Sequence, residues 1–165
     1  MGRLFSGIAL LAILSASACS KPALAEPTFA SDDALARAVL EAVERKDADR
    51  LLAMAVSREE FESIVWPTLP VSRPEVNMPF AYVWQDNLTK SRAYLGDTLA
   101  RFGGRHLELV RVEFGGDSTA YGTYDVSRET RLVVRDPDGA EHAFRLFGSI
   151  IRQNGRSKVL SYIVD

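Results

Sequence analysis

The spacing of the apolar side chains changes at Gly103-Gly104, and this change constrains the fold more than any other feature of the sequence. Over residues 80–102, apolar side chains recur at steps of 3, 4 or 7 positions, which keep them on one side of a helix and predict a long amphipathic helix. After the glycine pair they alternate, as in strands with one buried face. Helices followed by strands predict an α+β domain, with N-terminal helices packed on one face of a bent antiparallel sheet of about four strands.

Capping residues predict where the earlier helices begin. Ser31 with two following aspartates is typical of a helix start, because the hydroxyl caps backbone N–H groups and carboxylates favour the positive first turn. This helix is expected to break at residues 46–49 and to resume over 51–55. Ser57 and Glu60 have the capping-box spacing for the next helix.

Residues 66–79 hold four of the seven prolines and predict a stiff, irregular loop. Pro67 is expected to end the helix before the loop. Asn77 is expected to cap the helix after it.

Four strands are expected over residues 106–114, 120–135, 141–152 and 157–164. Turn sequences at residues 136–139 and 154–155 predict hairpins between the last three. These turns set the register in which the strands pair. The expected pairs are Leu132 with Phe144, Thr130 with Leu146, Arg128 with Gly148, Val126 with Ile150, Ile150 with Val159, Gly148 with Ser161, and Leu146 with Ile163.

The first 19 residues have the layout of a secretory signal. Arg3 supplies positive charge, residues 4–14 are mostly apolar, and small residues precede Cys19. The apolar stretch of 11 residues is shorter than the roughly 20 that a spanning helix needs. An ordinary signal peptide, cleaved elsewhere and leaving Cys19 without a role, is one interpretation.

The segment also resembles a bacterial lipoprotein signal, in which the cysteine becomes the lipidated first residue of the mature protein. That resemblance implies that residues 1–18 are removed and that Cys19 carries a lipid anchor. Residues 19–30, with two prolines, are then expected to form a flexible tether for a domain of residues 31–165. Because Ser20 follows the cysteine, the resemblance implies the outer membrane, facing the periplasm.

Composition and motifs argue against several classes of protein. With 20 basic and 22 acidic residues, the chain offers no general basic surface for nucleic acid. One cysteine excludes an intrachain disulfide and a multi-cysteine zinc site, and two histidines make a histidine-rich metal site unexpected. We find no G-x-S-x-G, phosphate-loop or H-E-x-x-H motif, and we predict no metal, cofactor or catalytic residue.

The order of elements resembles the nuclear transport factor 2-like superfamily, also called SnoaL-like or cystatin-like α+β cone domains. The resembling segments are the helical residues 31–55, the helix over 80–102 and the strands over 106–164. The resemblance implies a pocket between the concave face of the sheet and the helices. The superfamily includes isomerases, cyclases and dehydratases as well as binding and dimerisation modules, so the fold does not determine the function.

Three residues interrupt the apolar face predicted for the sheet. Arg128, Gly148 and Ser161 lie side by side in the expected registers, with the glycine leaving room between the other two. One interpretation is a site for an anion or a carbonyl, anchored by Arg128. The other is a strand that bends at Arg128 and places the guanidinium in solvent.

The sequence allows more than one role for several aromatic and titratable residues. Trp84 and Tyr124, together with Leu88, are expected either to line the pocket or to pack in the core. His142 and Asp165 are expected close together at the rim, while each histidine also fits a structural or surface role. The opposite sheet face carries further apolar residues, which predict either helix cover or a homodimer through the sheet. These residues are Phe147, Ile151, Leu160, Tyr162 and Val164.

We therefore expect a non-catalytic cell-envelope lipoprotein that binds a small hydrophobic or anionic ligand, or a protein partner. The alternative is an isomerase or dehydratase acting on a small hydrophobic substrate. Enzymes of that kind in this superfamily use a buried carboxylate or histidine as general base. The middle of the predicted inner face carries neither.

Overall fold

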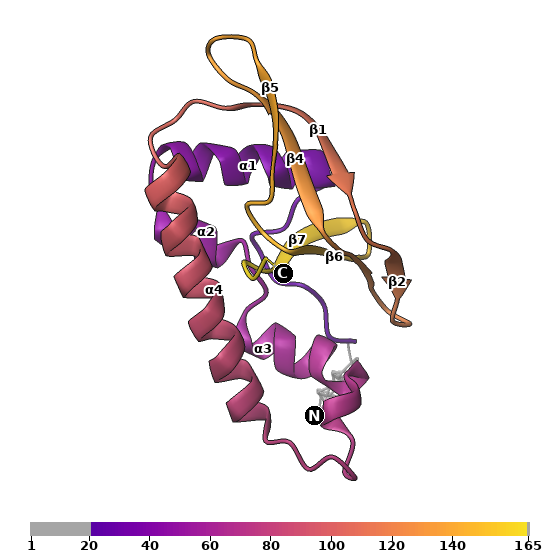
Figure 1. Cartoon of the computed structure of the whole chain (residues 1–165). Coiled ribbons are helices and arrows are strands. Elements are labelled where there is room, and N and C mark those ends of the chain that lie inside the picture. The colour runs from indigo at the N-terminus through magenta and orange to yellow at the C-terminus, as the bar shows by residue number, and fades with distance from the viewer. Residues whose placement is uncertain (1–20, 165) are drawn as a thin grey trace, which may run out of the picture.

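The computed structural model describes residues 21–164 (Figure 1). The predicted signal, Cys19 and Asp165 lie outside the described residues. Within residues 21–164, no helix is both long enough and apolar enough to cross a bilayer.

The helices begin at the predicted capping residues. The Ser31 hydroxyl accepts a hydrogen bond from the Ala34 N–H at 3.1 Å, and Ser57 and Glu60 form the predicted capping box. These bonds satisfy N–H groups that lack partners inside the helix. The helices are α1 (Asp32–Glu44), α2 (Ala48–Ala53), α3 (Arg58–Glu60) and α4 (Phe80–Phe102).

The proline-rich segment between α3 and α4 contains three short helical turns. They are η1 (Phe61–Val65, a π-type turn), η2 (Trp66–Thr68) and η3 (Pro70–Ser72), the latter two of 3-10 type. The run of α- and π-type helix that begins after Ser57 ends at Val65, just before Pro67, which lies near the start of η2, where its missing N–H costs little. The prediction that Asn77 caps α4 is wrong: Pro79 precedes the helix and no side chain caps it.

In the described residues, seven strands form two antiparallel sheets, whereas the alternation predicts one sheet of about four strands. The α+β class is confirmed, with the strands following α4. One sheet has the order β1-β4-β5 and the other β2-β3-β6-β7. Figure 1 shows α1 lying against the three-stranded sheet and α4 running down one side of the molecule. The strands are β1 (Glu108–Phe114), β2 (Ser118–Ala120), β3 (Asp125–Ser127), β4 (Thr130–Arg135), β5 (Glu141–Phe144), β6 (Ser149–Gln153) and β7 (Arg156–Ser161).

Two of the long predicted strands break where the chain passes from one sheet to the other. The break between β3 and β4 contains Glu129, whose φ of 53° lies in the left-handed region. The N–H groups of Gly115 and Gly116 donate to the carbonyls of Glu129 and Arg128 across this break. A Cβ on Gly115 would lie 2.6 Å from Glu129 Oε2, so the glycine allows a close crossing of the two chains. The other break, over residues 145–148, separates β5 from β6.

The breaks shift part of the predicted strand register. The confirmed pairs are Leu132 with Phe144 and Ile150 with Val159. The shifted pairs are Val126 with Ile151, and Ser161 with Ser149. Each shift is one residue, because the break after β3 and an irregularity between Ser149 and Ile150 each add a residue to one strand.

The apolar residues of the second sheet face are covered by the N-terminal helices. Phe147, Ile151 and Tyr162 are each at most 1% exposed. Phe147 and Tyr162 belong to the main core with α1 and α2, and Tyr162 donates to the Leu51 carbonyl at 2.6 Å. Ile151 packs in a second cluster with Phe61. Helix cover therefore explains these three residues, and they offer a homodimer no exposed surface.

Residues 22–29, predicted as part of a flexible tether, are instead bound along the domain; we call them the N-terminal strap. The Gln153 side chain accepts from the Leu24 N–H at 2.9 Å and donates to the Pro22 carbonyl at 3.2 Å. Phe29 forms an antiparallel bridge with Ser157 next to β7. The folded unit therefore begins before residue 31.

A buried ion pair holds the middle of the strap. Lys158 and Glu60 are 2% and 5% exposed, and their charged groups lie 2.9 Å apart. Lys158 Nζ also donates to the Ala25 carbonyl at 3.0 Å, and the Ala25 N–H donates to Glu60 at 2.6 Å. Both charges are thus hydrogen-bonded, as burial demands.

Candidate functional site

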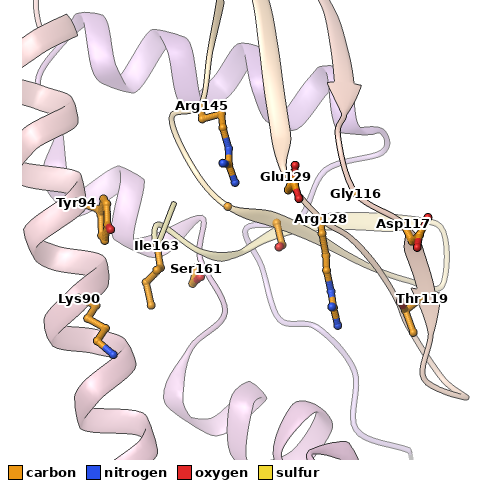
Figure 2. A pocket seen from close by; sticks show the side chains of 12 residues that line it. Lys90, Tyr94, Gly116, Asp117, Thr119, Arg128, Glu129, Arg145, Ser161 and Ile163 are labelled. Carbon is orange, nitrogen blue, oxygen red and sulfur yellow. The ribbon is translucent and has the colours of Figure 1, made fainter. Parts of the chain in front are cut away.

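A cavity of about 1000 Å³, which we call the central pocket, lies between α4 and the place where the two sheets meet (Figure 2). Five separate stretches of the chain form it: α4, the β1–β2 connection with β2, the β3–β4 break, the β5–β6 connection, and the end of β7. The lining residues are Lys90, Tyr94, Gly116, Asp117, Thr119, Arg128, Glu129, Arg145, Gly148, Ser149, Ser161 and Ile163.

The structure brings the predicted row of Arg128, Gly148 and Ser161 together at this pocket. The Gly148 carbonyl accepts from the Thr130 N–H at 2.9 Å, and the Gly148 N–H donates to the Ser161 carbonyl at 3.2 Å. The three residues therefore stay on neighbouring chain segments although their register shifts by one.

The sequence suggests that Gly148 leaves open space between Arg128 and Ser161, but the structure shows no such space. It is buried, and a Cβ built on it would collide with the carbonyl oxygen of Ile163. The backbone after β7 fills the volume that a side chain would need. Gly148 is therefore required by a close backbone approach, a common reason for glycine in a sheet.

Arg128 combines features of both predicted roles. The strand breaks beside it and the residue is exposed, as the solvent interpretation requires. Its Nη2 donates to Tyr121 Oη at 2.8 Å, and the Tyr121 ring stacks on Tyr124 with centroids 5.2 Å apart. This bond uses one of the N–H donors of the guanidinium, which holds Arg128 at the rim and leaves other donors for a ligand.

Charged groups and hydroxyls dominate the lining of the central pocket. Lys90, Arg128 and Arg145 contribute three positive charges to the lining, and Asp117 and Glu129 contribute two negative charges. Lys90 is also paired with Asp86, one turn earlier on α4, at 2.7 Å. In Figure 2, Lys90 projects from α4 on one side and Arg128 from the strands on the other, with Arg145 extending between them. Guanidinium groups, an ammonium group and hydroxyls around one cavity suit a polar ligand with an acidic group. The hydroxyls belong to Tyr94, Thr119, Ser149 and Ser161.

Trp84 and Leu88 line a different cavity, of about 150 Å³, between α4, α2 and β7. Leu52 and Leu160 make this second cavity largely apolar, and Ser161 borders both cavities. Trp84 therefore does not line the pocket with Arg128: it borders a separate and smaller cavity and packs against the second core cluster.

Tyr124 packs in the core and does not line the central pocket. It is 4% exposed and lies in the cluster that contains Val126 and Ile151. Its hydroxyl is 2.6 Å from the Thr68 hydroxyl. Burial raises the pKa of Tyr124, because the phenolate would lose its hydration. The core-packing interpretation holds for this residue.

Neither histidine lines the central pocket. His142 Nε2 lies 2.9 Å from Asp136 Oδ2 in the β4–β5 turn, and His106 Nδ1 lies 3.0 Å from Glu44. The hydrogen bond from His142 lowers the pKa of Asp136 below its ordinary value. The partner predicted for His142, Asp165, lies outside the described residues. Over residues 21–164, no group of three His, Cys, Asp or Glu side chains is placed to hold a metal ion.

Sequence reasoning missed several residues of the pocket. Lys90 and Tyr94 share one side of α4, but helical spacing does not tell which polar side faces a pocket. Uninterrupted alternation would place Glu129 on the sheet face opposite Arg128, but the strand breaks at the Glu129 backbone, so both residues line the pocket. The other missed charged residues are Asp117 and Arg145, both in connections between strands.

A scan against protein-family models finds no match to this chain, and searches of curated proteins and of solved structures find no similar protein. The resemblances to nuclear transport factor 2-like domains and to lipoprotein signals therefore remain predictions from the sequence.

Proposed function

We propose that this protein is a non-catalytic binding module, held at the bacterial envelope by a lipid on Cys19, whose central pocket binds a small polar ligand with an acidic group. The observation that carries the proposal is the convergence of Lys90, Arg128 and Arg145 on one cavity of about 1000 Å³. Small-molecule sites span about 300–1000 Å³, so this pocket has room for an organic molecule rather than a single inorganic ion.

The lining favours an acidic ligand over the hydrophobic one that the sequence also predicts. Carboxylates and phosphates accept charge-assisted hydrogen bonds from guanidinium and ammonium groups, and these bonds are about twice as strong as neutral ones. A purely apolar ligand would strip water from these charges without replacing the lost hydrogen bonds. The apolar cavity beside Trp84 has only about 150 Å³ for such a molecule.

The groups at the pocket favour binding over the isomerase or dehydratase alternative. A general base in such an enzyme needs a pKa tuned by burial and a position beside the substrate. The carboxylates that line the pocket, Asp117 and Glu129, are both exposed. Both histidines lie elsewhere, paired with Asp136 and Glu44.

Native mass spectrometry of the full-length protein, extracted from membranes in mild detergent, tests the binding proposal. We expect an acidic small molecule to co-purify with the protein. Its occupancy should fall in an Arg128→Gln variant and persist in Arg37→Gln, a matched control on α1 outside the pocket. Equal occupancy in both variants would argue against the role of Arg128.

Titration with defined acids and their neutral analogues measures how much Arg128 contributes to the binding affinity. Dicarboxylic and uronic acids should bind, whereas their neutral amides or sugars should not. Loss of a charged hydrogen bond in Arg128→Gln should cost about 1.5–3 kcal/mol, which corresponds to roughly 10–100-fold in affinity. Equal binding of acids and neutral analogues would contradict an electrostatic site.

The anchor has its own test. Cys19→Ala should abolish incorporation of a labelled fatty acid and should release the protein from membranes. Membrane association that persists without labelling would contradict the lipid anchor and leave the binding proposal standing.

A further inference from the structure

Exposed apolar side chains gather at one end of the molecule. Val76, Met78 and Tyr82 are 49%, 36% and 65% exposed, and they lie within seven residues at the entrance to α4. They are three of the five large apolar side chains that stand out as exposed in the described part of the chain. Single exposed apolar residues are ordinary, whereas a local group marks a surface that contacts something. We call these three residues the apolar rim.

The backbone that carries the apolar rim is held in place by packed aromatic side chains. Next to it, the Phe80 ring lies 6.3 Å from the Phe61 ring and 5.5 Å from the Trp66 ring. The Arg58 guanidinium lies 5.2 Å above the same Phe80 ring. Prolines before and within the loop further restrict its backbone. The rim is therefore a surface with a defined position.

The N-terminal strap brings the start of the described chain to the same end. Leu24 packs against the same buried cluster, around Phe61, as Trp66, Leu69 and Phe80 do. Ala25 is held there by both members of the buried pair Lys158 and Glu60. In Figure 1, the indigo start of the chain and the loop before α4 both lie in the lower half of the view, away from the three-stranded sheet.

The covalent distance from this end to the anchor is short. Only three residue steps separate Cys19 from Pro22, the first strap residue bound to Gln153. At 3.3–3.6 Å per residue, they span at most about 11 Å. A flexible tether of residues 19–30 would let the domain turn freely, but a bound strap keeps this end of the domain beside the anchor.

We infer that the apolar rim rests on the phospholipid bilayer to which Cys19 is attached, an inference that depends on the proposed lipid anchor. Tyrosine with neighbouring aliphatic side chains suits the boundary between headgroups and acyl chains, where an apolar body and a polar tip are both satisfied. Arg73 and Glu75, beside the rim, carry opposite charges. The contact therefore depends on apolar burial rather than attraction to anionic lipid, and salt should not weaken it.

The single native cysteine makes a direct test simple, because lipidation leaves no free thiol. Val76→Cys and, as the matched control, Asp138→Cys in the turn between β4 and β5 each introduce one exposed thiol for a polarity-sensitive fluorophore. Full-length labelled proteins are then reconstituted in phosphatidylcholine vesicles that contain nitroxide-labelled lipid. The emission maximum of the fluorophore at position 76 should shift to shorter wavelength, and the nitroxide should quench most of this emission. The fluorophore at position 138 should show neither change.

Three results would overturn the inference, and they are distinguishable. If the protein floats with the vesicles but positions 76 and 138 respond alike, the rim does not contact lipid although the anchor stands. If the protein stays in the aqueous fraction and carries a second reactive thiol, Cys19 is not lipidated and the inference falls together with the anchor. Repeating the quenching in high salt separates apolar contact from electrostatic adsorption: quenching that salt abolishes also contradicts the inference.

Discussion

Two glycines of this chain, Gly148 and Gly96, differ in how much space their surroundings would leave for a side chain. A Cβ on Gly148 would collide with the Ile163 carbonyl, whereas a Cβ on Gly96, in the exposed middle of α4, would meet nothing within 4 Å. Both look like ordinary glycines in the sequence. Their different roles follow from what lies opposite each backbone.

The first prediction uses these two glycines as a matched pair. Gly148→Ala should destabilise the domain by about 1–3 kcal/mol, because the added methyl forces the chain after β7 to move. Gly96→Ala should instead stabilise it by up to about 1 kcal/mol through helix propensity. Urea unfolding of the two variants beside the parent measures both. Equal midpoints would show that the Gly148 backbone relaxes freely.

The second prediction concerns the turn between β4 and β5. The His142 hydrogen bond lowers the pKa of Asp136 below its ordinary 3.8. A lowered folded-state pKa means that the stabilisation is complete above the unfolded value and is lost as pH falls through the folded value. His142→Ala should raise the Asp136 pKa toward 3.8 in an NMR titration of the carboxyl carbon. An unchanged titration curve would assign the shift to the Asp138 and Ala140 backbone N–H groups alone.

At the scale of elements, short turns and caps are read well from the sequence and long strands are not. Ser31 and the Ser57–Glu60 capping box act between residues at most three apart, so local chemistry is sufficient. The strand over residues 120–135 has a continuous alternating pattern and still breaks into three. At the break, the Glu129 and Arg128 carbonyls accept from Gly115 and Gly116 in the β1–β2 connection, and no local pattern encodes that crossing.

The third prediction concerns the ion pair between β7 and α3. Lys158→Met should cost about 3–5 kcal/mol, because it leaves Glu60 buried without its charged partner. Adding Glu60→Gln should restore part of that loss, because the glutamine keeps an acceptor for the capping box without a buried charge. A double-mutant cycle in denaturant measures the coupling. Additive losses would indicate that the two charges do not stabilise each other.

At the scale of the whole molecule, the N-terminal strap changes what counts as the domain. Gln153, Ser157 and Lys158 all bond to residues 22–29, so the strap is part of the surface of β6 and β7. The Arg156 side chain also donates to the Thr28 carbonyl at 2.7 Å. An anchor two residues before Lys21 would therefore hold a positioned body rather than a freely swinging one.

The fourth prediction compares chains that begin at Lys21 and at Ala30. The shorter chain should melt at a lower temperature, because Lys158 and Glu60 lose their bonds to Ala25 and the buried cluster around Phe61 loses the cover of Leu24. Each kcal/mol lost should lower Tm by about 2–8 °C for a domain of this size. Coincident melting curves would show that the strap adds no stability.

The homodimer through the sheet stays a prediction at this scale. The apolar residues that suggested it, Phe147, Ile151 and Tyr162, are buried inside one chain. The exposed strands β1 and β5 are joined by charged pairs such as Arg111 with Glu141, at 3.7 Å. Sedimentation at increasing concentration decides whether any association persists.

The sequence alone determined the α+β class, the boundaries of α1, the end of α4 at Phe102, and the pairing of Leu132 with Phe144, because periodicity, caps and tight turns act over a few residues. It also placed Arg128, Gly148 and Ser161 beside one another. Only the tertiary structure decided that the strands form two sheets and that residues 22–29 are bound to β6 and β7. It also decided that five separate stretches of the chain come together around the central pocket. Those outcomes depend on contacts between residues far apart in the chain, where backbone crossings such as Gly148 on Ile163 select one arrangement.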